Sequence, residues 1–249
     1  MKNVKVILWG LGAMGGGIGK MLTKKKGVDI VGAIDIGAKV GKSLYEVVPG
    51  IVKGDREDVI VGTPEEVIKP GVADIVVVCT NSFTKDVFDK LVFVMERGMN
   101  VITSAEEMAY PQAQEPELAK KLDEIAKKNG VSVMGTGINP GLIMDLLVVL
   151  WTAACEEVNH VTSRRVNSLS PFGPAVMEEQ GIGISVEEFN ERKANGTMAG
   201  HVGFAESTMM ICDALGWKWD DFGQDMEPIV TDVDRKSPYG FAAAGQVAG

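Results

Sequence analysis

The sequence predicts an α/β fold in which a doubly wound parallel sheet is followed by an α+β region. Two observations carry this prediction. Short apolar strands alternate with amphipathic helices up to about residue 134. Residues 75–79 (IVVVC) form a continuous apolar run, which is typical of a parallel strand covered by helices on both faces.

The other elements of the first half follow the same reasoning. Short apolar or β-branched runs predict the remaining strands at residues 5–9, 29–34, 58–61, 100–103 and 131–134. Apolar residues at helical spacing predict helices at residues 13–25, 84–97 and 115–128. A further helix is expected at Thr63, which can act as N-cap before Pro64 and Glu66. We assign residues 1–140 to one domain.

The pattern changes after Gly141. Residues 142–154 predict a strongly apolar helix, residues 158–166 a half-buried strand and residues 204–215 a helix. Residues 171–203 are glycine-rich and are expected to be irregular. We assign residues 141–249 to a second domain that binds substrate.

Composition excludes several classes of protein. The 249 residues are 45% hydrophobic and 24% charged, with a net charge of −9. This acidic balance argues against nucleic-acid partners and anionic membrane surfaces. No apolar run reaches the length of a membrane span. The three cysteines are odd in number, widely spaced and form no C-x-x-C pair, so we expect neither a structural metal site nor a disulfide framework, which fits a cytoplasmic location.

The strongest motif lies between the first strand and the first helix. Gly10, Gly12 and Gly15 fit the pattern G-x-G-x-x-G, with Ala13 and Met14 at the start of the helix. This pattern, in this context, indicates a Rossmann-type dinucleotide site, whose glycines allow a tight turn and close approach to a pyrophosphate. The helix N-terminus supplies amide donors to the phosphates. The alternative is a glycine-rich turn in an unrelated α/β protein.

An acidic residue supports the dinucleotide interpretation. Asp35 follows the second strand, 20 residues after Gly15, where a ribose hydroxyl acceptor is expected. Its carboxylate favours NAD, because it repels the 2′-phosphate of NADP. Lys39 and Lys42 can offset that repulsion or can be solvated loop residues. The choice between NAD and NADP stays open.

Further cofactor contacts are expected where other strands end, since these loops face the ligand crevice. Thr80 and Asn81 follow the fourth strand and are candidates to contact the nicotinamide ribose, with capping of the next helix as the alternative. Asn139 follows the last strand and is a candidate to orient the nicotinamide or to polarise a substrate.

Two adjacent carboxylates follow the fifth strand. Glu106 and Glu107 are the candidates for the catalytic base, because a carboxylate beside the nicotinamide can take a proton from a substrate ammonium. Neighbouring residues on a strand point to opposite faces, so one is expected to serve the site and the other to face solvent. The alternative is that both form the acidic first turn of a helix.

Several longer stretches carry a resemblance to a known family. They read VILWGLGAMGGGIGKML, ITSAEEMAYP, GTGINPGLIMDLL, RRVNSLSPFGPAVMEEQGIG and GHVGFAESTMMICDALGW, and they span nearly the whole chain. In these stretches the chain resembles the 2,4-diaminopentanoate dehydrogenase family, which is related to dihydrodipicolinate reductases and native amine dehydrogenases. The paired histidines of the reductases and the G-G-x-K-G pattern of amino-acid dehydrogenases are missing.

The resemblance implies an enzyme that oxidatively deaminates 2,4-diaminopentanoate with NAD or NADP, giving 2-amino-4-oxopentanoate and ammonia, as in ornithine degradation. It assigns the amine and water chemistry to Glu106, with Glu107 as the fallback. The family is longer than this chain, which ends in an apolar Gly/Ala run at residues 242–249. We therefore expect the second domain to be incomplete.

The substrate site is less defined by the sequence. Arg165, favoured over Arg164 by the matching RVN segment, is a candidate to bind the substrate carboxylate, and a surface ion pair is the alternative. His201 is either a pocket residue or a structural histidine, as His160 is expected to be. Apolar pocket candidates are Leu142, Ile143, Phe172 and Met177.

Two other functions stay open: an amine dehydrogenase or imine reductase acting on another amine, and a dinucleotide-sensing protein without catalysis. The apolar second domain also suggests a homo-oligomer.

Overall fold

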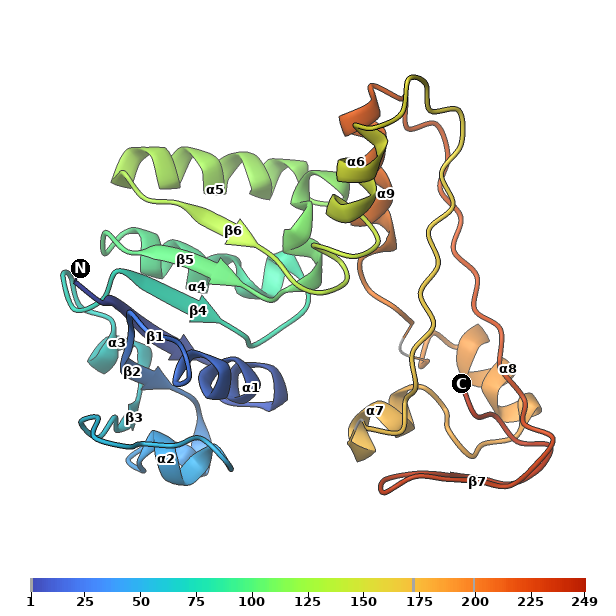
Figure 1. Ribbon diagram of the computed structural model, residues 1–249, viewed down its shortest axis with the longest axis horizontal. Coiled ribbons are helices and arrows are strands. Elements are labelled where there is room, and N and C mark those ends of the chain that lie inside the picture. Colours follow the sequence, from blue (N-terminus) through green and yellow to red (C-terminus); the bar gives the residue numbers. More distant parts are fainter. Residues whose placement is uncertain (1, 172, 199) are drawn as a thin grey trace. The chain divides into compact units, whose positions relative to one another are not determined.

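A six-stranded parallel sheet forms the centre of the first half of the chain. The computed structural model describes residues 2–171, 173–198 and 200–249 (Figure 1). The strand order is β3-β2-β1-β4-β5-β6. Strands β2 and β3 are added on one side of β1 and strands β4 to β6 on the other, so the strand order reverses between β1 and β4, which are parallel. This confirms the predicted fold class. The strands are β1 Val4–Trp9, β2 Val28–Ile34, β3 Val61–Gly62, β4 Ile75–Val78, β5 Asn100–Thr103 and β6 Val133–Gly135.

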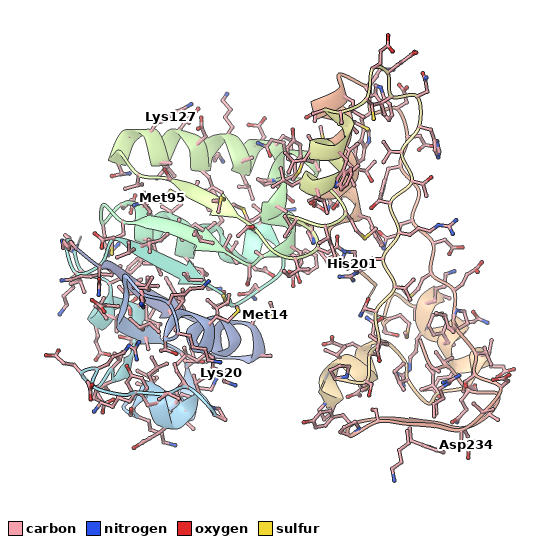
Figure 2. All side chains as sticks on the ribbon, in the orientation of Figure 1. Met14, Lys20, Met95, Lys127, His201 and Asp234 are labelled. Atoms are coloured by element: carbon pink, nitrogen blue, oxygen red, sulfur yellow. The ribbon has the colours of Figure 1, made fainter. Side chains whose placement is uncertain are left out.

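Helices cover both faces of this sheet, as the alternation along β1 shows. Val6 and Leu8 pack with residues of α1 and α2, whereas Ile7 and Trp9 pack with residues of α4 and α5. Met95, labelled in Figure 2, is fully buried on the second of these faces. The helices are α1 Ala13–Leu22, α2 Leu44–Val47, α3 Pro64–Val67, α4 Thr84–Met95 and α5 Pro116–Asn129, with 3-10 turns η1 Gly37–Lys39, η2 Glu106–Ala109 and η3 Pro111–Ala113.

The rest of the chain contains short helices and a small hairpin. Its elements are α6 Leu146–Thr152, α7 Pro174–Glu179, α8 Val186–Ala194, α9 Phe204–Leu215, β7 Arg235–Lys236 and β8 Phe241–Ala242. The chain divides into two compact units, of which the first comprises residues 1–159 and 203–218. The second comprises residues 160–202 and 219–249. The domain boundary after residue 140 stays a prediction.

The structure corrects three element predictions. Residues 158–166 alternate like a strand, but they form no strand, because no described segment pairs with them. The helix predicted from residue 142 begins at Leu146, because Asp145 accepts the first amide and caps it. Residues 171–203 are not wholly irregular, since α7 and α8 begin there at Pro174 and after the N-cap Ser185.

In the described chain, no helix is long and apolar enough to cross a bilayer.

Candidate active site at the carboxyl edge of the sheet

The turn between β1 and α1 is close-packed on one side. Gly10 has a φ of +93°, and a Cβ added there would lie 2.4 Å from the carbonyl oxygen of Cys79. A Cβ on Gly15 would lie 1.8 Å from the carbonyl oxygen of Gly10. Only glycine fits at either position, because backbone cannot move aside as a flexible side chain can. The turn is therefore held tightly against the end of β4.

The opposite side of this turn is open. Gly12, Ala13 and Met14 are exposed, and no atom lies within 4 Å of a Cβ added to Gly12. Figure 2 labels Met14, in the first turn of α1. Gly12 is the N-cap of α1 and provides no side chain to cap the first amides. Backbone donors at a helix N-terminus with open space above them fit the pyrophosphate of a dinucleotide.

Asp35 joins the end of β2 to this turn. Its Oδ2 accepts from the backbone N–H of Leu11 at 2.8 Å and from Lys39 Nζ at 2.7 Å, and its Oδ1 accepts from the N–H of Ile36. Burial raises the pKa of this carboxyl, but the hydrogen bonds from Lys39 and the two amides outweigh burial and lower it overall. Asp35 is thus an ionised acceptor at the predicted ribose position, with Lys39 beside it. Lys42 forms no hydrogen bond or ion pair with it.

Thr80 and Asn81 lie in the loop after β4, and both are exposed. The Thr80 methyl carbon would be 3.1 Å from a Cβ on Gly10, so this residue borders the glycine turn. Asn81 Oδ1 accepts from Lys90 Nζ at 2.6 Å, which ties the loop to α4. Thr80 thus borders the proposed cofactor site, whereas the contact shown for Asn81 is with α4.

Glu106 and Glu107 have different environments on the 3-10 turn η2. Glu107 is buried, with 7% of its surface exposed, and its Oε2 accepts from the N–H of Thr84 at 2.7 Å. This bond caps the start of α4. Glu106 is half-buried, and within the described chain no hydrogen bond or ion pair holds its carboxylate. Neither glutamate lies on a strand or is fully exposed, which corrects the expected arrangement, and both lie in the first turn of the 3-10 helix η2, as in the alternative.

The turn that carries Glu106 is fixed on several sides. The N–H of Glu107 donates to the carbonyl of Ser82 at 3.1 Å, and the N–H of Ser104 donates to that of Val78. A Cβ added to Gly135, at the end of β6, would lie 1.9 Å from the carbonyl oxygen of Met108. The turn is therefore packed between the ends of β4 and β6, and β4 separates its strand β5 from β1, which leads into the glycine turn.

The loop after β6 is fixed by a buried carboxylate that the sequence analysis missed. Asp145 is fully buried and accepts from the N–H of Gly141, the N–H of Leu146 and the hydroxyl of Ser207. Asn139 is half-buried in this loop, and Leu142 is exposed just after it. The distinguishing signal was available, since Asp145 lies in the GTGINPGLIMDLL stretch at a predicted helix start.

A second missed group lies at the start of α9. Glu206 is fully buried, and its Oε1 accepts from Gln114 Nε2 at 2.7 Å. Burial raises the pKa of Glu206, and the charge of Glu107 adds to this effect. Tyr110 also contacts α9, donating to Asp213 at 2.5 Å, and burial together with that carboxylate raises its pKa to about 12.

The predicted substrate residues fall in both units. Arg165 and Met177 line one cavity of about 700 Å³ in the second unit. His201 is half-buried in that unit, and its carbonyl accepts from Gln224.

The remaining substrate candidates do not share one place. Arg164 and Arg165 do not lie on a strand, contrary to the prediction for residues 158–166, and both side chains are exposed. Ile143 is half-buried in the first unit, His160 bonds Thr162 in the second, and Phe172 is outside the described residues. The described residues contain no cluster of acidic, histidine or cysteine side chains suited to a metal ion.

Comparison with known proteins identifies the family. The whole chain is 66% identical, over 250 aligned residues, to a 2,4-diaminopentanoate dehydrogenase from Acetoanaerobium sticklandii, and the match covers 70% of that relative. The chain belongs to the 2,4-diaminopentanoate dehydrogenase family. Residues 142–249 also match the model of this family's C-terminal domain.

A solved structure supports the same family assignment. The amine dehydrogenase from Mycobacterium smegmatis superposes with a TM-score of 0.71 and 27% sequence identity. The match covers 99% of this chain and 72% of that structure, so both units of the 2,4-diaminopentanoate dehydrogenase family member have counterparts there.

Proposed function

We propose that this protein oxidatively deaminates 2,4-diaminopentanoate at its 4-amino group, with NAD or NADP as the oxidant. The products are 2-amino-4-oxopentanoate, ammonia and the reduced cofactor. The observation that carries the proposal is the 66% identity, over the whole chain, to a 2,4-diaminopentanoate dehydrogenase. The glycine turn and the Glu106 turn at one edge of the sheet are consistent with it.

The glycine turn is the proposed cofactor site. Gly10, Gly12 and Gly15 let the backbone approach the pyrophosphate, with the amides of Ala13 and Met14 as donors. Asp35 is the proposed ribose acceptor, and Thr80, Asn81 and Asn139 border the path toward the nicotinamide end. The bound nicotinamide supplies the hydride acceptor for the reaction.

Glu106 is the proposed catalytic base. Its carboxylate is half-buried and has no partner among the described residues, so it can accept a proton. The Glu107 carboxylate is already engaged with the N–H of Thr84 and is buried, which suits a structural cap better than proton transfer. These two environments favour Glu106 over Glu107.

The proposed role of Glu106 follows from the proton balance. Its carboxylate takes a proton from the substrate ammonium, because only the neutral amine has the lone pair that assists loss of hydride from the adjacent carbon. After Glu106 has released this proton to solvent, water attacks the resulting iminium and gives a proton to the Glu106 carboxylate. Glu106 then passes that proton to the amino nitrogen of the carbinolamine. The C–N bond breaks as the hydroxyl loses its proton to form the carbonyl, and the nitrogen leaves as ammonia.

Substrate recognition is proposed for the second half of the chain. Arg165 is the candidate to bind the substrate carboxylate, because a guanidinium can form two parallel bonds to it. His201 and Leu142 are candidates to contact the rest of the substrate. The free state of the three cysteines fits a reducing compartment such as the cytoplasm, and the exposed apolar residues of α6, such as Trp151, support a homo-oligomer.

A substitution pair tests the catalytic assignment. Glu106→Gln keeps the size of the side chain but cannot accept the proton, so we expect kcat to fall about 10²- to 10⁴-fold with cofactor affinity unchanged. Steady-state reduction of NAD with 2,4-diaminopentanoate and a fluorescence titration with NADH measure the two quantities. Glu117→Gln, an exposed carboxylate in α5, is the control and should keep wild-type values. Turnover by Glu106→Gln close to that of the control would reject the role.

A further inference from the structure

One oxygen of the buried Glu206 carboxylate has no evident role in stability. This atom, Oε2, is buried and has no hydrogen-bond partner in the described chain. A buried carboxylate oxygen without a partner costs free energy, so an apolar residue of similar size would stabilise this position better. Its presence therefore calls for another explanation, and its contacts suggest one.

Those contacts connect α9 to the turn that carries Glu106. Gln114 Nε2 lies 2.7 Å from Oε1 of Glu206 and 3.5 Å from Oε1 of Glu107. One amide nitrogen thus donates to carboxylates from two elements, α9 and η2. The other oxygen of Glu107 accepts from the N–H of Thr84 at 2.7 Å. Both carboxylate oxygens of Glu107 thus accept hydrogen bonds, and Glu106 is the adjacent residue in the same turn.

The first turn of α9 also holds the loop after β6. Ser207, next to Glu206, donates to Asp145 at 2.9 Å, and Asp145 in turn accepts from the N–H of Gly141. Gly203 packs closely against Pro140, since a Cβ added to Gly203 would lie 2.4 Å from the proline ring. Successive residues of α9 thus contact the two segments that carry Glu106 and Asn139.

We propose that Glu206 is a positioning residue, which acts through Gln114 and Glu107 to hold the Glu106 carboxylate in place for proton transfer. This inference rests on the proposed function, in which Glu106 is the base. A misplaced base slows the chemical step without weakening cofactor binding, because the glycine turn is a separate structure. The expected signature is a lower kcat with an unchanged affinity for NADH.

A double-substitution cycle tests this role. Glu206→Leu and Gln114→Leu each remove one partner of the same hydrogen bond, so each should lower kcat about tenfold. The double variant should be no slower than the slower single variant, because the two changes break one connection. Glu206→Gln keeps an acceptor for Gln114 and should retain activity within about threefold of wild type. Glu117→Leu, an exposed residue of α5, is the matched control and should behave as wild type.

The outcomes separate this inference from the proposed function. Wild-type kcat in Gln114→Leu would overturn the positioning role, and so would fully additive losses in the double variant. Gln114 is at the surface, so this variant decides the question even if Glu206→Leu does not fold. Loss of turnover in Glu106→Gln together with a normal Gln114→Leu rejects only the positioning role. Normal turnover in Glu106→Gln rejects the catalytic assignment itself.

Discussion

At the scale of single residues, neighbouring groups of the same type take different roles through their partners. Glu106 and Glu107 are adjacent, but Glu107 caps α4 and Glu106 has no partner in the described chain. Lys39 and Lys42 are also near each other, but only Lys39 contacts Asp35, at 2.7 Å. Residue type alone would treat each pair as equivalent, whereas the partner of each group decides its chemistry.

The lysine pair gives a prediction about cofactor choice. Lys39 places a cation beside the Asp35 carboxylate, and this cation can offset repulsion of a 2′-phosphate. Lys39→Ala should therefore lower kcat/KM for NADP relative to NAD by about two- to fivefold, as expected for a partly exposed charge. Lys42→Ala is the matched control and should leave the ratio unchanged. Equal ratios in both variants would show that Lys39 has no part in the preference.

At the scale of elements, the glycine turn and α1 work as one unit. Two of the helix glycines differ sharply in surroundings, although both lie in α1. Gly15 faces the backbone of Gly10, whereas no atom lies within 4 Å of a Cβ added to Gly17. Glycine is required at position 15, because the Gly10 backbone lies too close for a side chain, but it is not required at position 17.

Alanine substitutions at these two positions should have different effects, since Gly15→Ala should weaken NADH binding and Gly17→Ala should stabilise the fold. Gly15→Ala places a Cβ 1.8 Å from a carbonyl oxygen, so the turn must open, and NADH affinity should fall at least tenfold. Gly17→Ala adds only helix propensity and should raise the free energy of unfolding by about 0.5–1 kcal/mol. Fluorescence titration with NADH and urea denaturation measure these effects. Retained NADH affinity in Gly15→Ala would contradict the proposed role of the turn.

At the scale of the whole molecule, the first compact unit is assembled from distant parts of the sequence. Residues 203–218 join residues 1–159, and the chain between them belongs to the second unit. Buried polar groups hold this late segment in place, namely Glu206 and Ser207 of α9 with Gln114 and Asp145. The stability of the assembled unit should therefore depend on the ionisation of Glu206.

The raised pKa of Glu206 should make the stability of the protein depend on pH. Burial raises its pKa in the folded protein, so its contribution is full below the unfolded pKa and is lost as pH rises through the folded pKa. Glu206→Gln removes this loss, because the amide does not ionise. The Tm of the variant relative to wild type should rise as pH increases above the ordinary pKa of a glutamate, about 4.3. A Tm difference that does not change with pH would contradict the prediction.

The sequence predicted the sheet well, because β-branched runs and helical spacing are local signals. Strand β5 matches its predicted range, and so does helix α9. The segment at residues 158–166 was misread, because alternation does not supply a pairing partner. Likewise, Glu206 could not be found from spacing, because its partner Gln114 is distant in sequence and only the fold brings the two together.

The central claim is tested most directly by the reaction itself. The purified protein is incubated with NAD and 2,4-diaminopentanoate, and the reduced cofactor, ammonia and 2-amino-4-oxopentanoate are quantified together. The account predicts all three in equal amounts, at a rate above that with monoamines lacking a carboxylate. Reduction with other amines alone would contradict the proposed substrate. NADH binding without reduction by any amine would contradict the proposed catalysis.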